Sequence, residues 1–345
     1  MAKIKQSNIE LCRIIAILAV MLIHTTFQSL GFNVSFGVLL LAGFSIIGVN
    51  VFVMLTGYFT AVPKKTSLFN LAFVCFFWMV VKVLCRYVCN EPITYKHFFF
   101  VTTSNWFVAS YIGLLFFAPI LNIFCNIVNK KTLWSVVTAL LIVEIWFDWL
   151  PPHPAISLGT NGGHSVLSFL ILYLLARAIR LYGLPTWFRR LSPLIYLVCS
   201  FLLAFLGLFL IWHGNEDMVS WLFYDNNPIV ILSSVAFLTI FEKMNIKQSK
   251  SINHVAKSTL AILLGHSAIF FAYTKQFKYL YDHFSNMHVV VVLGFVNNHC
   301  FLLNHLNRPN THLAISTYRK KDDGKNKQQQ HIRITYTLII NQANN

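Results

Sequence analysis

Three ionisable side chains, Glu10, Arg13 and His24, lie within the first long apolar stretch of the chain. Placing an ionisable group inside a membrane-spanning helix costs free energy, so such residues indicate a functional site by default. Arg13 and His24 are eleven residues apart. This is close to three full helical turns, which predicts one shared helix face and a separation of about 16 Å along the axis. Glu10 precedes Arg13 by about one turn, a spacing at which the two side chains can form an ion pair.

The chemistry of these side chains suggests a site with two ends. The planar guanidinium of Arg13 suits phosphate oxygens, and Glu10 can orient it. The imidazole of His24 can take a proton from a hydroxyl group as a general base, or it can accept an acyl group transiently. A purely structural interpretation stays open, in which Arg13 reaches the headgroups and His24 forms an interhelical hydrogen bond. The shared face favours an anion-binding residue at one end and a base deeper in the membrane.

The elements that must position these residues follow from composition. Hydrophobic residues make up 57% of the 345-residue chain and charged residues 11%, whereas soluble domains carry about 25% charged residues. Apolar runs of about 20 residues, enough to cross a bilayer, recur between short polar breaks. The sequence therefore predicts an all-α, polytopic transmembrane helix bundle of about ten helices. Their approximate ranges are 9–28, 37–60, 68–88, 105–128, 132–150, 164–182, 192–212, 228–244, 257–274 and a less apolar run at 287–303.

Basic residues are distributed unevenly between the predicted loops. The formal net charge of +16 would by itself suggest nucleic acid or another anionic partner. However, lysines and arginines collect in alternate loops, as they do in the cytoplasmic loops of membrane proteins. This pattern predicts a cytoplasmic N-terminus, the lipid bilayer as a partner and no nucleic acid. The basic residues of the predicted cytoplasmic loops are Lys3, Lys5, Lys64, Lys65, Lys130, Lys131, Arg177, Arg180, Arg189, Arg190, Lys243, Lys247, Lys250 and Lys257.

Three predicted outer loops have a different character, being polar, aromatic and rich in turn residues. They cover residues 90–104, 149–163 and 213–227. Their composition suits contact with a hydroxylated ligand, and it equally suits an aromatic belt at the membrane interface.

Several classes of site have no support in the sequence. No phosphate-binding loop, dinucleotide-binding motif, zinc-ligand spacing or nucleophile elbow is present. We therefore expect no metal and no permanently bound cofactor. The first apolar run retains Arg13 and lacks a small-residue cleavage site, which argues against a cleavable signal peptide.

The arginine and histidine of the first helix also carry a resemblance. Arg13, ten intervening residues and His24 match the first-helix pattern of the acyltransferase-3 family of membrane acyltransferases. Four further segments agree with that family: 48–59 (GVNVFVMLTGYF), 106–122 (WFVASYIGLLFFAPILN), 163–182 (GHSVLSFLILYLLARAIRLY) and 258–266 (STLAILLGH). The resemblance covers about residues 8–295, and within the family the chain looks like the polysaccharide O-acetyltransferases. Gly265 departs from the pattern, which usually has a bulkier aliphatic residue before the histidine at His266.

The resemblance implies transfer of an acyl group, usually acetyl, from cytoplasmic acyl-CoA to a hydroxyl group of an extracytoplasmic or cell-surface glycan. In that case Arg13 and Glu10 would contact acyl-CoA as the donor substrate, and His24 would be the catalytic residue. His266 would be a second histidine of the same site. The implied location is a bacterial cell (inner) membrane. The expected cavity residues are Trp106, Tyr111 and Asn122.

Two other functions fit parts of the sequence. A glycan or lipid transporter or flippase would also be polytopic, but the two halves of this chain lack the matching broken helices typical of transporters. An inactive relative of the acyltransferases is suggested by the C-terminal region. We predict a membrane acyltransferase domain at 1–296 and a polar tail at 297–345. The Asn-, Gln- and Lys-rich composition of the tail favours disorder or an altered last helix.

Three further residues have predicted structural roles. Glu144 and Asp148 are four residues apart and share one face of the predicted fifth helix. There they could pair with Lys82 or Arg86, or act on the histidine. Gly57 is predicted to permit the close approach of two helices.

Overall fold

In a computed structural model of the chain we describe residues 6–24, 35–99, 105–150 and 159–266, together with residues 268, 279 and 283. All of them belong to one compact unit that spans residues 1–300. The predicted run at 287–303 and the predicted tail at 297–345 lie outside the described residues. The domain boundary at 296 therefore stays a prediction.

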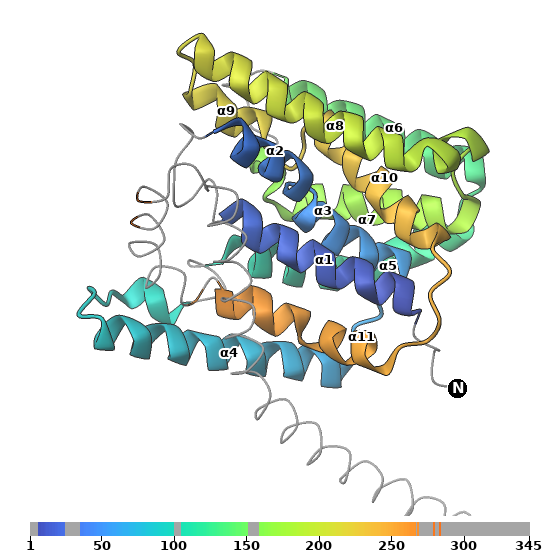
Figure 1. The fold of residues 1–345 in the computed structure, drawn as a ribbon. Helices are drawn as coiled ribbons and strands as arrows, with labels where there is room; N and C mark the ends of the chain where they lie inside the picture. The colour runs from blue at the N-terminus through green and yellow to red at the C-terminus, as the bar shows by residue number, and fades with distance from the viewer. Residues whose placement is uncertain are drawn as a thin grey trace, which may run out of the picture. The chain divides into compact units, whose positions relative to one another are not determined.

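The described part of the chain consists of helices and connecting loops, with no strand (Figure 1). The prediction of an all-α transmembrane bundle of about ten helices is therefore confirmed. The α-helices are α1 (Ser7–Ile23), α2 (Phe36–Ser45), α3 (Gly48–Tyr58), α4 (Lys65–Val88), α5 (Trp106–Ile127), α6 (Lys130–Glu144), α7 (Val166–Tyr182), α8 (Thr186–Trp212), α9 (Asp217–Leu222), α10 (Pro228–Lys243) and α11 (Lys250–Val255). Shorter helical turns are η2 (Tyr95–Phe98), η4 (Ile145–Trp149), η5 (Asn161–Gly163) and η6 (Ala256–Ser258).

Five helical stretches of the described chain are long and apolar enough to cross a membrane. They are Phe36–Tyr58, Lys65–Val88, Trp106–Ile127, Lys130–Trp149 and Thr186–Trp212. Helices α1, α7 and α10 are shorter, at 17, 17 and 16 residues. A rise of about 1.5 Å per residue gives each of these three about 25 Å, slightly less than the hydrocarbon core of a bilayer.

Most predicted bounds lie within a few residues of the structure, and two predicted ranges differ from it more clearly. The apolar run at 37–60 contains two helices, α2 and α3, which meet at a turn formed by Ile46 and Ile47. Helix α8 begins at Thr186, six residues before the predicted start at 192. Its first turns contain Arg189 and Arg190, which lower the local hydropathy although the backbone is already helical after Pro185. The prediction followed hydropathy alone, which detects neither a turn inside an apolar run nor a polar first turn.

Helix α3 forms the centre of the described bundle. It packs against α1, α7 and α10, and all of its residues except Thr56 are buried. Figure 1 shows α3 between α1 and α7. A helix that is apolar on all faces is typical of the core of a protein. Helix α3 is therefore the element against which α1, α7 and α10 pack.

Large apolar side chains cover the outer faces of the peripheral helices. Phe69 and Phe76 on α4 are exposed, as are Phe205 and Phe209 on α8. Buried polar residues such as Asn50 lie in the interior instead. Soluble proteins rarely expose such a density of aromatic side chains, so these faces are suited to contact with lipid.

The contact between α3 and α7 leaves no room for a side chain at Gly57. A Cβ atom at this position would lie 2.5 Å from the carbonyl oxygen of Tyr173 and 3.2 Å from the Cβ atom of Ala176. The prediction that Gly57 permits close helix approach is therefore confirmed.

Substitution of Gly57 by leucine is expected to destabilise the fold by about 1–3 kcal/mol or more, because the backbone of α7 must move. Thermal unfolding of the purified protein in detergent measures the effect. Gly207→Ala is the matched control, since the nearest atom to its added Cβ would be the flexible tip of Leu39 at 3.4 Å. An unchanged melting temperature for Gly57→Leu would show that the contact between α3 and α7 is not required.

Candidate active site

Three helices begin next to one cavity, and capping residues fix each beginning. The Asn105 side chain accepts a hydrogen bond from the backbone of Val108 and so caps α5 just before Trp106. Ser165 caps α7 directly after His164. Asn227 caps α10, with Pro228 at its first position, two residues after Asp225. Because these caps define the helix starts, they also fix the side chains that flank them.

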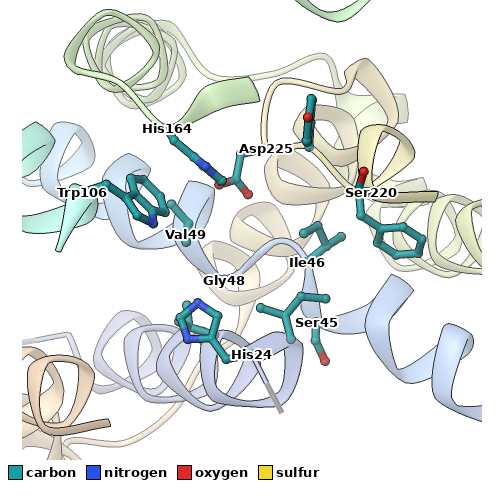
Figure 2. Close-up of a pocket in the computed structure, with 13 residues that line it drawn as sticks. His24, Ser45, Ile46, Gly48, Val49, Trp106, His164, Ser220 and Asp225 are labelled. Carbon is teal, nitrogen blue, oxygen red and sulfur yellow. The ribbon is translucent and has the colours of Figure 1, made fainter. Parts of the chain in front are cut away.

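The cavity has a volume of about 190 Å³. His24, at the C-terminal end of α1, contributes to its wall together with the first residues of α3. Figure 2 shows His24 on one side of the cavity and His164 with Asp225 on the opposite side. The lining residues are Val20, Ile23, His24, Ser45, Ile46, Gly48, Val49, Trp106, His164, Ser220, Phe223, Tyr224 and Asp225.

His24 and His266 form a pair at one side of the cavity. The Nδ1 atom of His24 lies 3.0 Å from the Nε2 atom of His266. The two rings are stacked, with centroids 5.1 Å apart and planes inclined by 20°. His266 is only 1% exposed. One imidazole donates and the other accepts according to the tautomer, so the pair can fix the proton position on His24.

A second polar group, formed by His164 and Asp225, faces the same cavity. The Nε2 atom of His164 lies 3.2 Å from the Oδ2 atom of Asp225. The Asp225 side chain is 5% exposed and that of His164 is 37% exposed. The ring of His164 stacks on Trp106 with centroids 4.0 Å apart. The carboxylate and the indole together hold the imidazole in one orientation at the cavity wall.

The backbone around Asp225 is held by further hydrogen bonds. Asn50 on α3 donates from Nδ2 to the carbonyl oxygen of Asp225 at 2.7 Å. The backbone N–H of Asp225 donates to the carbonyl oxygen of Gly162 at 3.0 Å. Gly163 has φ +94°, and a Cβ atom there would lie 2.6 Å from the Cβ atom of Asp225. A glycine is needed at this close approach, so this loop has little freedom to move Asp225.

Glu144 and Asp148 form hydrogen bonds with other partners instead of ion pairs with Lys82 or Arg86. Glu144 accepts a hydrogen bond from the hydroxyl of Ser168. Asp148 accepts one from the backbone of Gly162 and one from Asn226. Asp148 therefore acts on the loops that carry His164 and Asp225, and it makes no contact with His24 among the described interactions.

Glu10 and Arg13 lie at the opposite end of α1. The expected ion pair is present, with Arg13 Nη1 2.9 Å from Glu10 Oε2. The Arg13 guanidinium also lies over the ring of Phe59, 5.9 Å from its centroid. Neither residue lines the cavity that contains His24. The two ends of α1 thus have different surroundings, and the roles of Glu10, Arg13 and His24 stay predictions.

The predicted cavity residues lie in three different places. Trp106 lines the cavity beside His24. Tyr111 lines a second cavity of about 240 Å³ and forms a 3.3 Å hydrogen bond with Thr56. Asn122 is buried, where it donates to the carbonyl oxygen of Ala61 at 3.0 Å and accepts from the Tyr173 hydroxyl at 2.7 Å.

His164 and Asp225 were not predicted as site residues from the sequence, although their positions in the predicted loops gave a signal for both. His164 follows one predicted outer loop and Asp225 lies near the end of another. His164 lies two residues before the start of α7 and Asp225 three residues before the start of α10, so the two loops could have been expected to meet at the same membrane face. Which of their polar side chains face a cavity depends on tertiary contacts that hydropathy does not contain.

The fold and this arrangement define a class: a membrane protein whose described residues form helices and loops, in which His24, bonded to His266, and the His164–Asp225 pair face one cavity. Residues 6–297 match the family model described as an acyltransferase domain. The chain therefore belongs to the acyltransferase-3 family, and it is a membrane acyltransferase. No curated protein and no solved structure matches the chain.

Proposed function

We propose that this protein transfers an acetyl group from cytoplasmic acetyl-CoA to a hydroxyl group of an extracytoplasmic or cell-surface glycan. Its place is the inner membrane of a bacterial cell. The observation that carries the proposal is the contact between His24 and His266 at the wall of a cavity large enough for the reacting groups. Membership of the family supports acyl transfer as the reaction. His24 is a residue that can act as the base for a hydroxyl group.

The orientation of the helices supports a cavity on the outer face. Helix α1 runs from the end that carries Arg13 to the cavity, whereas α5, α7 and α10 start at the cavity. Basic residues gather at the ends of these helices that lie away from the cavity, and such residues favour the cytoplasmic side. In this orientation the N-terminus is cytoplasmic, and an acceptor reaches the cavity from outside.

In the proposed reaction, His24 accepts the proton of the acceptor hydroxyl through the ring nitrogen that is not bonded to His266. The hydroxyl oxygen forms a bond to the thioester carbonyl carbon, and the carbon–sulfur bond breaks as the tetrahedral intermediate collapses. The proton then passes from His24 to the departing thiolate, which gives an ester and free CoA. His266 keeps the His24 ring in position and shares the positive charge of the imidazolium.

A two-step variant uses the same residues. His24 attacks the thioester carbon through the ring nitrogen that is not bonded to His266, the carbon–sulfur bond breaks and CoA departs as a thiolate, while the proton of the other ring nitrogen passes to His266. The acceptor hydroxyl then attacks the acyl-imidazole, and His266 returns the proton to His24 as the carbon–nitrogen bond breaks. His164 can take the hydroxyl proton in the second step, because it faces the cavity and is oriented by Asp225. Both variants place the donor carbonyl beside His24 and the acceptor hydroxyl between His24 and His164.

Transfer of radiolabelled acetyl groups tests the proposed function directly. Membranes that contain the protein are expected to move label from acetyl-CoA into surface glycan, whereas matched membranes without the protein are not. Alkaline treatment should release the label as acetate, because an O-acetyl ester is labile to base. A wild-type protein that is inserted normally yet labels no glycan would contradict the proposal and favour a transporter or an inactive relative.

A further inference from the structure

Three guanidinium groups converge on the C-terminal end of α3. Three consecutive residues there, Tyr58, Phe59 and Thr60, each contact one arginine. Arg180 donates to the Tyr58 hydroxyl at 2.8 Å and lies over its ring. Arg13 lies over the ring of Phe59. Arg177 donates from Nη1 to the hydroxyl of Thr60 at 2.5 Å.

Arg177 is the most unusual member of this cluster, because it is only 5% exposed. Its Nε atom is buried and makes no hydrogen bond within the described part of the chain. No carboxylate of the described residues forms an ion pair with it or with Arg180. A buried charge is costly unless an opposite charge and hydrogen bonds compensate for it.

The local charge balance is positive. The acidic groups near the end of α3 are Glu10, which pairs with Arg13, and Glu242, which accepts a hydrogen bond from Tyr58 and lies 4.0 Å from Arg189. Two carboxylates thus face four guanidiniums among the described residues. The bias of membrane proteins towards cytoplasmic Lys and Arg explains exposed loop residues, but it gives no reason to bury Arg177. An incoming anion would supply the missing charge.

An apolar cavity lies directly beside this cluster. It has a volume of about 240 Å³, and three of its lining residues, Ala61, Val62 and Pro63, follow Thr60 in the chain. Tyr111 lines the same cavity and contacts Phe52, further along α3 towards the cavity of His24. An elongated ligand with a phosphate-rich end and a less polar arm matches this sequence of surroundings.

We propose that Arg177 and Arg180, with Arg13, bind the phosphate groups of the acyl-CoA donor, while the apolar cavity beside Thr60 receives its thioester arm. This inference rests on the proposed function. The guanidinium fork suits phosphate oxygens and can bind two of them at once. The Thr60 and Tyr58 hydroxyls hold the two arginines in position before the ligand arrives, which lowers the entropic cost of binding.

The test compares two donors that differ in their phosphates. Arg177→Gln and, separately, Arg180→Gln are expected to raise KM for acetyl-CoA about 10- to 100-fold, the effect of losing a hydrogen bond to a charged group. The rate with S-acetylpantetheine, which lacks phosphates, should be unchanged. Arg190→Gln is the control, because Arg190 is another exposed basic residue of the predicted cytoplasmic side and is not one of the three arginines that contact Tyr58, Phe59 and Thr60. An equal loss with both donors would overturn the proposal, since it would indicate structural damage.

Binding of radiolabelled CoA to the purified protein separates this inference from the proposed function. Wild type that binds CoA in an Arg177-dependent manner but transfers no acetyl group would support the phosphate site and contradict the transfer. CoA binding that is unaffected by both substitutions would contradict the phosphate site, whatever the transfer shows. A phospholipid headgroup is the other source of phosphate. If anionic lipid, but not CoA, raises the melting temperature in an Arg177-dependent manner, the donor assignment is wrong.

Because Arg177 is buried, Arg177→Gln can fail to fold. The exposed Arg180 then carries the test alone, and Arg177→Lys provides a further variant that keeps the charge but loses the planar fork. Lysine at this position should restore less than the full affinity for CoA. Full restoration would show that charge alone, without the geometry of the guanidinium, accounts for binding, and it would contradict phosphate recognition by the fork.

Discussion

Replacement of His24 by alanine is expected to lower acetyl transfer to glycan by at least about 100-fold, the smallest effect typical of losing a positioned general base. The expectation follows from the position of His24 at the cavity wall and from its 3.0 Å contact with His266. The methyl side chain of alanine can neither take a proton nor accept an acyl group. Transfer of radiolabelled acetyl from acetyl-CoA, at matched levels of protein in the membrane, measures the loss.

The control for this substitution is His213→Ala. His213 follows α8 in a predicted outer loop, is exposed and bonds to the carbonyl oxygen of Phe209, away from the cavity. The His213→Ala variant should retain the activity of wild type. Equal labelling by wild type and His24→Ala would remove His24 as the base and, with it, both variants of the mechanism. The melting temperature of His24→Ala shows whether any loss reflects chemistry or unfolding.

His266 provides a graded comparison with His24. As a positioning residue it acts through the ring of His24, so His266→Ala should reduce the maximal rate less than His24→Ala does. Its effect on KM for acetyl-CoA should be small, because it lies away from the basic end of α1. The spacing of Arg13 and His24 was visible in the sequence, whereas His266, 242 positions away from His24, was expected in the same site only through the family resemblance.

The sequence predicted those features that depend on local periodicity and composition. Helix geometry alone indicates that Arg13 and His24 lie at two ends of one face, and the ion pair of Glu10 with Arg13 follows from their spacing. The turn between α2 and α3 was not predicted, because Ile46 and Ile47 are as apolar as the helices that flank them. Tertiary packing against neighbouring helices decides the conformation at such a point.

The remaining features depend on which loops meet. Asp148 links two of these loops, through Gly162 and Asn226, and no pattern in the sequence specifies those partners. The same holds for the end of α3, where arginines from α1 and α7 approach consecutive residues. Composition predicts that these arginines lie on the cytoplasmic side, but only the fold shows that one of them is buried near an apolar cavity.

Asp225→Asn is expected to reduce transfer to glycan by up to about 100-fold, because a small displacement of a reacting group can cost that much. The carboxylate of Asp225 lies 3.2 Å from His164 Nε2 and holds the ring against Trp106. An amide of the same shape removes the charge and presents an N–H group as often as an oxygen. His164 then loses its fixed orientation and its preferred proton position.

The kinetic pattern of Asp225→Asn distinguishes positioning of the acceptor from general damage. We expect a lower kcat/KM for the glycan acceptor, an unchanged KM for acetyl-CoA and unchanged slow hydrolysis of acetyl-CoA by water. Asp217→Asn is the matched control, since Asp217 is an exposed acid at the first position of α9 and does not line the cavity. A parallel fall in glycan transfer and hydrolysis would mean that Asp225 supports the site of His24 as a whole. Because His164 and His24 face one another across the cavity, only a selective loss assigns His164 and Asp225 to the acceptor hydroxyl.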